Sequence, residues 1–311
     1  MTEKNYLKAL KFFKKAYNCP EGKEDIDLIL DLAFLYDKIA NFDLAEKMYR
    51  KVIELDDTNA IAYYGLGIIY DDDELYEEAI EYYKKAIEND NKYEKAYFFL
   101  ANAYDELGNK EEAIKNYKEV LKINPKDLWA NANLGCIYDE LGDTKLALEY
   151  MEKALEIDSK HFRILFNMGV FNKKLGNLKL AEEYYKKSIE ENPYYPYSYL
   201  NYAVMYREKE DYNRAIEIIN EGILENKDEG FLYYNRACFY VCINKLDLAL
   251  EDILKSIELN DFFEEYMKED EDLDIKRYLD KNTVDKFVFI QICLLFILII
   301  YYLFFQDINH D

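Results

Sequence analysis

Histidine and cysteine, the side chains most often used for nucleophilic, acid–base and metal chemistry, are few in this 311-residue sequence. The two histidines, His161 and His310, are far apart, and neither has a cysteine at the spacing of a metal site. Cys238 and Cys242 would share one face of a helix, but two thiols without a histidine make a poor metal site, so burial in a core or groove is the better interpretation. The sequence has no glycine-rich phosphate loop. We therefore expect no enzyme activity, no cofactor, no metal and no small-molecule substrate.

Asparagine side chains recur at a regular interval and suit a different chemistry, the recognition of a peptide. They stand 34 residues apart at Asn133, Asn167, Asn201 and Asn235. A carboxamide has both a donor and an acceptor, which match the C=O and N–H groups of a peptide backbone. The alternative is that asparagine is simply common at this place in each repeated segment.

A second strip with the same interval is acidic. It consists of Asp37, Asp71, Asp105 and Asp139, with Asp72, Glu106 and Glu140 beside it. Lys173, Lys174 and Arg207 stand at the equivalent places further along, so a surface built from these residues would be negative first and positive later. Solvated helix ends are the alternative explanation. Because acidic pairs recur every 34 residues, they are typical of a repeated structural feature or a binding strip and not of a single active site.

The same interval governs the apolar residues that must hold these side chains in place. It is marked by seven alanines, Ala45, Ala79, Ala113, Ala147, Ala181, Ala215 and Ala249. Nine residues before each alanine stands a tyrosine, except at Asn172, and three residues before that stands a glycine or an alanine. Small residues let two helices approach closely, and larger side chains fill the remaining space. The scarcity of turn-forming residues, 10 Gly and 4 Pro, agrees with helices throughout.

Each interval has the pattern of a helical hairpin. In the segment from Glu94 to Asp127, Leu100 and Tyr104 mark one face of a first helix. Gly108 and Asn109 then form a helix terminator and turn before the second helix. One hairpin cannot bury its apolar face alone, so stacked hairpins are expected to share a continuous core.

These residues and this interval resemble the tetratricopeptide repeat family, whose units are 34-residue antiparallel helix pairs. The resemblance implies an all-α fold, a right-handed α-solenoid of tandem helix-turn-helix units. We expect an N-terminal half-repeat and loop at 1–25, then seven units at 26–59, 60–93, 94–127, 128–161, 162–195, 196–229 and 230–263. An acidic closing segment at 264–286, a hydrophobic segment at 287–305 and a short tail at 306–311 would follow. The chain departs from the family at Asn131, which replaces the usual aromatic residue of a first helix, and keeps the terminal proline only as Pro125 and Pro193.

The resemblance also implies which residues face a ligand. In this family the first helix of each unit lines the concave surface, so the four regularly spaced asparagines are expected there. Their arrangement is similar to the asparagine ladder that lines the repeats of some protein glycosyltransferases. Packed helices lie about 10 Å apart and an extended peptide advances about 3.3 Å per residue, so one asparagine would hold roughly every third residue.

A second site of the family, a clamp for the C-terminal carboxylate of heat-shock chaperones, is only partly present. Asn102, Asn133 and Arg163 stand at matching places. Phe98 and Asn167 replace two of the cationic residues that the clamp needs, so a receptor for chaperone tails is not expected.

The net charge of -23, from 63 acidic and 40 basic residues, limits the possible partners. Such a surface repels the phosphates of nucleic acids and disfavours lying flat on anionic lipid. It attracts cationic protein segments over a distance, although solubility alone is the alternative reason for the charge. The five cysteines are odd in number and scattered, which indicates no disulfide framework and a reducing environment.

Residues 287–305 contain no charged side chain and only one strongly polar one, Gln291. As a helix they would span about 28 Å, near the thickness of the hydrocarbon core of a bilayer, so we expect a single transmembrane helix. Basic residues precede the segment at Lys276, Arg277, Lys281 and Lys286, and none follows it, which places the repeats in the cytoplasm as in a tail-anchored protein. The alternatives are a buried helix that caps the solenoid and a lipid-anchor signal whose tail is removed.

The function that this sequence indicates is a membrane-tethered scaffold whose cytoplasmic groove binds an extended, cationic segment of another protein. The alternative is a structural subunit of a membrane-associated assembly, held through its convex face.

Overall fold

The computed structural model describes residues 3–260, and within this range it contains helices and no β-strand. The first helices are α1 (Glu3–Tyr17), α2 (Ile26–Lys38), α3 (Phe42–Leu55), α4 (Ala60–Asp72), α5 (Tyr76–Asn89), α6 (Glu94–Glu106), α7 (Lys110–Ile123) and α8 (Leu128–Glu140). The remaining ones are α9 (Thr144–Ile157), α10 (Phe162–Lys174), α11 (Leu178–Glu191), α12 (Pro196–Arg207), α13 (Tyr212–Glu225), α14 (Gly230–Cys242) and α15 (Leu246–Leu259). A short 3-10 helix, Glu21–Lys23, lies in the loop that follows α1.

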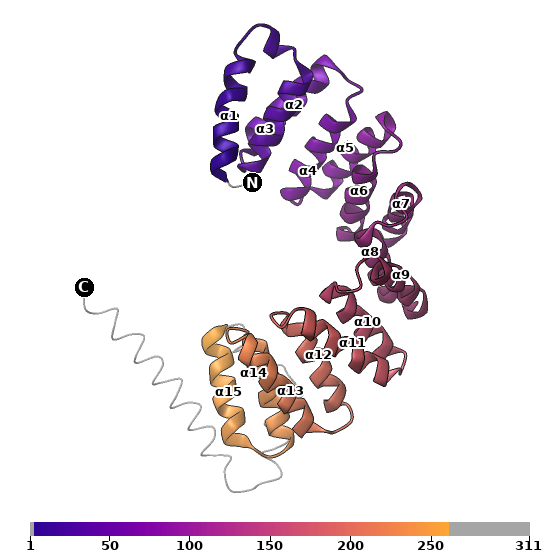
Figure 1. Cartoon of the computed structure of the whole chain (residues 1–311), viewed down its shortest axis with the longest axis vertical. Coiled ribbons are helices and arrows are strands. Elements are labelled where there is room, and N and C mark those ends of the chain that lie inside the picture. The colour runs from indigo at the N-terminus through magenta and orange to yellow at the C-terminus, as the bar shows by residue number, and fades with distance from the viewer. Residues whose placement is uncertain (1–2, 261–311) are drawn as a thin grey trace, which may run out of the picture. The chain divides into compact units, whose positions relative to one another are not determined.

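The chain forms two compact units, which divide between Glu191 and Asn192. In the first unit, α2 packs on α3 and the same pairing repeats through α10 and α11, so each pair is a helical hairpin (Figure 1). In the second unit, α12 pairs with α13 and α14 pairs with α15 (Figure 1). An all-α solenoid of helix-turn-helix repeats, as the sequence predicts, is therefore the architecture of the described residues.

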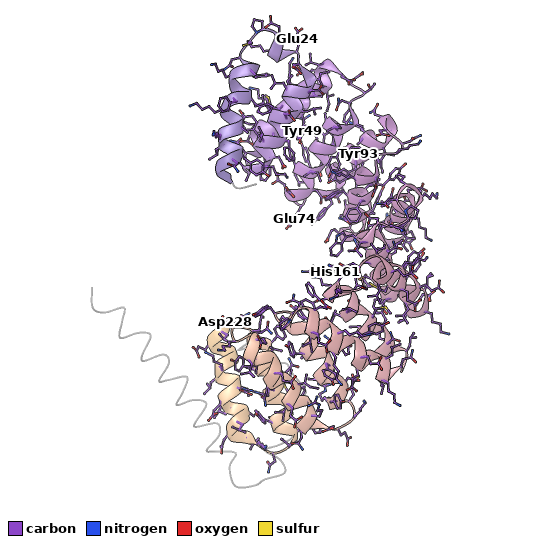
Figure 2. The ribbon with its side chains drawn as sticks, in the orientation of Figure 1. Glu24, Tyr49, Glu74, Tyr93, His161 and Asp228 are labelled. Atoms are coloured by element: carbon purple, nitrogen blue, oxygen red, sulfur yellow. The ribbon has the colours of Figure 1, made fainter. Side chains whose placement is uncertain are left out.

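The turn inside a hairpin contains one residue in the left-handed conformation, which some of the hairpins fill with glycine and others do not. Gly108 has a φ of 73°, a left-handed conformation that glycine adopts without strain. Asn109 then caps α7, because its side-chain oxygen accepts a hydrogen bond from the backbone N–H of Glu112 at 3.3 Å. The equivalent residue in the α4–α5 hairpin is Glu74, labelled in Figure 2, which has a φ of 60°. This turn carries strain because glutamate has a Cβ.

Small residues allow neighbouring helices to approach closely, both within a hairpin and between successive hairpins. The seven regularly spaced alanines are each at most 2 % exposed. Glycine permits the closest contacts, since a Cβ on Gly65 would lie 2.3 Å from the ring of Tyr49 and a Cβ on Gly67 would lie 2.4 Å from the ring of Tyr83. Tyr49 is one of the side chains labelled in Figure 2. Tyrosine rings packed against backbone are therefore part of the core of the first unit, together with aliphatic side chains.

Tyrosines also connect the successive hairpins from α2–α3 to α8–α9 through cations. Lys84 of α5 lies over the ring of Tyr104 in α6 at 5.4 Å, and Lys118 of α7 lies over the ring of Tyr138 in α8 at 5.5 Å. At the equivalent place Arg50 of α3 donates a hydrogen bond of 3.0 Å to the hydroxyl of Tyr70 in α4. We call this series the cation–tyrosine contacts. They explain part of the high tyrosine content, because each contact stabilises the boundary between two hairpins.

The N-terminal helix continues this packing. Tyr6, Ala9 and Phe13 of α1 pack against the apolar cluster that α2 and α3 form. This helix therefore covers a face of α2 that would otherwise be exposed to water.

Several segments that the sequence singles out lie outside the described residues. They are the end of the seventh predicted unit at 261–263, the acidic segment at 264–286, the hydrophobic segment at 287–305 and the tail at 306–311. Among the helices of residues 3–260, none is both long enough and apolar enough to cross a bilayer.

Candidate functional site

A pocket of about 450 Å³ lies on the first unit, where α4, α6 and α8 follow one another. The first helices of three successive hairpins contribute most of its lining. These residues are Asp71, Asp72, Phe99, Asn102, Asp105, Glu106, Asn133 and Cys136. Tyr76 of α5 and Tyr117 of α7 complete it. The pocket thus brings together members of both strips that the sequence predicts, the asparagines and the acidic residues.

Two asparagines in the pocket are held by one tyrosine. The hydroxyl of Tyr117 donates a hydrogen bond to Oδ1 of Asn102 and accepts one from Nδ2 of Asn133 at 2.8 Å. Burial of the ring raises the pKa of Tyr117, so its hydroxyl stays protonated and remains a donor. Because the hydroxyl fixes both carboxamides, the pair presents the NH₂ group of Asn102 and the carbonyl oxygen of Asn133 to a ligand. One donor beside one acceptor matches a peptide group.

The acidic residues of the pocket differ in their partners. Asp71 accepts a hydrogen bond of 2.7 Å from the hydroxyl of Tyr83, and Asp105 forms an ion pair of 2.7 Å with Lys110. Burial and the neighbouring carboxylates Asp72 and Glu106 raise the pKa of Asp71, although the hydrogen bond from Tyr83 acts in the opposite direction. Burial is also the main reason why the pKa of Asp72 is raised. Asp71 is therefore less solvated than an isolated surface carboxylate, and other carboxylates oppose its ionisation.

The remaining members of the acidic strip are paired with lysines. Asp37 forms an ion pair of 2.7 Å with Lys38. Asp139 pairs with Lys174, which comes from the following hairpin, and accepts a hydrogen bond of 2.8 Å from Thr144. The strip is thus partly neutralised at both ends, and its charge is least compensated at the pocket.

The four regularly spaced asparagines have different surroundings. Asn133 bonds to Tyr117, whereas Nδ2 of Asn167 donates to the sulfur of Cys136 at 3.5 Å. In the second unit, Asn201 and Asn235 donate to backbone carbonyls of their own helices, four residues earlier, at 3.0 and 2.8 Å. Only Asn133 of this set lines the pocket.

The parts of the chaperone-type clamp are brought together incompletely. Asn102 and Asn133 share the pocket, but Arg163 is exposed and lies over the ring of Phe162 at 5.7 Å. Phe98, at the place of a clamp lysine, packs edge-on against the ring of Tyr117 at 5.7 Å.

Among residues 3–260, the histidine and the cysteines are separate from the pocket, except for Cys136. His161, labelled in Figure 2, precedes α10, and its ring meets that of Trp129 edge-on at 5.0 Å. Cys238 is buried and Cys242 is exposed on α14. Cys136 does line the pocket, but burial and nearby acidic groups raise its pKa to about 11, which disfavours the reactive thiolate. Within residues 3–260, no group of three or more His, Cys, Asp or Glu side chains is placed to hold a metal ion.

Sequence reasoning missed four residues of the pocket, which are Tyr76, Phe99, Tyr117 and Cys136. The 34-residue interval contained a signal for two of them, because Phe99 stands one interval before Asn133 and Cys136 one interval after Asn102. No signal of this kind points to Tyr76, which reaches the pocket from the start of a second helix.

Comparison with known families identifies the class of protein. Sequence models of the tetratricopeptide repeat match residues 30–94, 94–127, 130–161, 162–195 and 184–217, which together are more than half of the chain. The chain belongs to the tetratricopeptide repeat family. A comparison with curated protein sequences found no match.

Solved structures with similar folds agree with this assignment. The chain is similar to YrrB, described as a tetratricopeptide repeat protein with an unusual peptide-binding site, at 27% identity over 60% of this chain and 95% of that one, with a TM-score of 0.51. It is also similar to MamA, at 28% identity over 54% of this chain and 92% of that one, with a TM-score of 0.50. A tetratricopeptide repeat protein from Parabacteroides merdae ATCC 43184 shares the fold at 22% identity, over 78% of this chain and 97% of that one, with a TM-score of 0.62.

Proposed function

We propose that this protein is a scaffold that binds an extended segment of another protein along the first helices of its hairpins. The observation that carries the proposal is the Asn102–Tyr117–Asn133 network, which holds one donor and one acceptor ready for a peptide group. The similarity to YrrB, whose description includes a peptide-binding site, supports the same function.

In this proposal the asparagines beyond the pocket extend the binding surface of the compact unit in which each of them lies. Asn167, Asn201 and Asn235 each use Nδ2 in an internal hydrogen bond. Their carbonyl oxygens are the groups that would accept from the backbone of a bound segment. Arg163 would contact the same segment as an exposed cation.

We also propose that residues 287–305 anchor the scaffold in a membrane, with the repeats in the cytoplasm. The support is the uncharged 19-residue stretch FVFIQICLLFILIIYYLFF and the basic residues before it. The full-length chain should remain in the membrane pellet after a carbonate wash, and a chain that ends at Lys286 should not. Release of the full-length chain by carbonate would contradict the anchor.

The binding function is tested with a degenerate pool of fluorescent peptides and the full-length chain in detergent. Peptides of about 11 residues, roughly 36 Å when extended, are long enough to cross three hairpins. The variants to compare are Tyr117→Phe, which removes only the hydroxyl, and the double variant Asn102→Ala with Asn133→Ala. Asn89→Ala is the matched control, because Asn89 is an exposed asparagine that bonds to its own helix outside the pocket.

Each lost hydrogen bond should weaken binding roughly two- to tenfold, and the loss should change little with salt because no charge is removed. The control should bind like the parent. If the double variant remains folded in a thermal melt and binds like the parent, the network does not hold a peptide. Binding would then have to use the other face, as the structural-subunit alternative requires.

A further inference from the structure

The pocket between α4, α6 and α8 has a strongly one-sided charge. Four of its lining residues, Asp71, Asp72, Asp105 and Glu106, are acidic, and none is lysine or arginine. The nearest compensation comes from Lys110, which pairs with Asp105 at 2.7 Å. The same ammonium group also contacts Glu140 at 2.6 Å, so its charge is shared between two carboxylates.

Three of the pocket carboxylates lack an ion-pair partner. Within residues 3–260, Asp71, Asp72 and Glu106 form no ion pair, although ion pairs are frequent elsewhere on the surface. The charge of Lys38 acts on Asp72 and lowers its pKa, but less than burial raises it. Asp71 is half-buried, with the hydroxyl of Tyr83 as its hydrogen-bond donor. Burying a carboxylate without a counter-charge costs free energy, and the raised pKa of Asp71 reflects that cost. A cation on a bound partner would remove this free-energy cost.

The shape and lining of the pocket favour a cation on an apolar stem. A volume of about 450 Å³ accommodates a long side chain together with its own backbone. The rings of Phe99 and Tyr76 offer apolar surface to methylene groups, while the carboxylates receive the charged end. The amide groups that Tyr117 fixes lie in the same pocket, where they can hold the peptide group next to that side chain.

We propose that this pocket is the receptor for one basic side chain, lysine or arginine, of the bound protein segment. The proposal rests on the function proposed above, and it adds the chemical identity of a residue that the partner must carry. Asp71, Asp105 and Glu106 receive the charge, and Asn102 and Asn133 hold the adjoining backbone. The choice of occupant follows from charge complementarity, which selects a cation-bearing protein segment for a pocket with this lining.

The test uses peptide pools in which only the central residue is fixed, as arginine, lysine, norleucine, glutamine or glutamate. The flanking positions are degenerate and contain no charged residue, so any preference arises from the centre. Affinities are measured by fluorescence anisotropy with the full-length chain in detergent, at low and high salt.

The variant that removes pocket charge is Asp71→Asn with Glu106→Gln. The matched control is Asp57→Asn with Glu88→Gln, which makes the same change in net charge at two exposed acidic residues outside the pocket. A thermal melt of each variant establishes that it is folded.

We expect the parent to bind the arginine and lysine pools at least about tenfold more tightly than the glutamine pool at low salt, because hydrogen bonds to charged groups are the stronger ones. The pocket variant should lose this preference to within about twofold, and the control should keep it. High salt should reduce the preference without abolishing it, since the pocket is partly shielded from solvent.

The other outcomes each overturn the proposal in a distinguishable way. Equal affinity for all pools means that the groove binds peptides without a basic-residue pocket, which leaves the proposed function standing. A preference that survives in the pocket variant places the recognition elsewhere. A preference that Mg²⁺ abolishes, when Na⁺ at equal ionic strength does not, makes the pocket a metal-cation site. The absence of binding to any pool overturns this inference and the proposed function together.

Discussion

Gly67→Ala is the substitution whose cost the structure defines most sharply. The new Cβ would lie 2.4 Å from Cε1 and 2.5 Å from Cδ1 of Tyr83, a ring that is 0 % exposed. Overpacking against the ring should lower the free energy of unfolding by about 1–3 kcal/mol. The higher helix propensity of alanine should offset about 1 kcal/mol of this loss. The hydrogen bond from Tyr83 to Asp71 would be disturbed as well. The expected net loss is about 1–2 kcal/mol.

Gly135→Ala is the matched control, because Gly135 occupies the same place in the repeat two intervals later. There the nearest atoms to the new Cβ are Cε of Met151 at 3.0 Å and the carbonyl oxygen of Ala147 at 3.1 Å. Methionine is flexible and can move aside, and the contact with the backbone oxygen is longer than the contacts at Gly67, so the stability of this variant should lie within about 1 kcal/mol of the parent.

Thermal melts followed by circular dichroism compare the two variants with the parent. Gly67→Ala should lower the melting temperature by roughly 2–8 °C, and Gly135→Ala should change it by less. If Gly67→Ala melts at or above both the parent and Gly135→Ala, the ring of Tyr83 is not in close contact with the backbone of α4, and this account of the core is wrong.

Three further predictions concern single sites and use the same melts. Ala113→Leu should destabilise the array by about 1–3 kcal/mol, because Ala113 is 0 % exposed between two helices, and a parent-like melt would exclude a close contact there. Asp71→Asn should raise the melting temperature at neutral pH, because a carboxyl whose pKa is raised by folding destabilises the native state once it is ionised. The parent should recover stability as the pH falls through that raised pKa, so a gain that persists unchanged in acid would contradict this explanation. Glu74→Gly should stabilise the protein by about 0.5–1 kcal/mol, because φ is 60° at this turn and glycine adopts a positive φ without strain. Gly108→Ala should destabilise it by a similar amount for the same reason, since φ is 73° there.

The fold could be predicted from the sequence because its main determinant is periodic. Alanine at Ala113 and glycine at Gly108 each perform a local task, close packing or a left-handed turn, and the same task recurs every 34 residues. Local chemistry of this kind can be recognised without coordinates. The strained turn at Glu74 could not be predicted from its residue, since its conformation is imposed by the hairpin.

The candidate site could be predicted only in outline. Asn133 and Asp71 follow from the interval, but the orientation of the Asn133 amide depends on the hydroxyl of Tyr117, which the sequence marks only as a core residue. The pairing of Asp139 with Lys174 spans 35 residues, so it depends on how neighbouring hairpins stack. The pattern made four asparagines look equivalent, yet Asn201 bonds to its own helix, because a rotamer depends on its neighbours and not on its place in the repeat.

The cation–tyrosine contacts have a consequence for how such a chain evolves. Each contact joins the second helix of one hairpin to the first helix of the next, so a duplicated hairpin would meet a compatible surface on both sides. The series is interrupted after Tyr138, because Glu152 and Asn172 occupy the places where the next cation and tyrosine would stand. Gene duplication or loss of a whole 34-residue segment among the hairpins that carry these contacts should therefore preserve their junctions, whereas the same event next to Glu152 and Asn172 would place a hairpin beside a neighbour without the contact. The number of repeats before Tyr138 is thus free to change without loss of this contact.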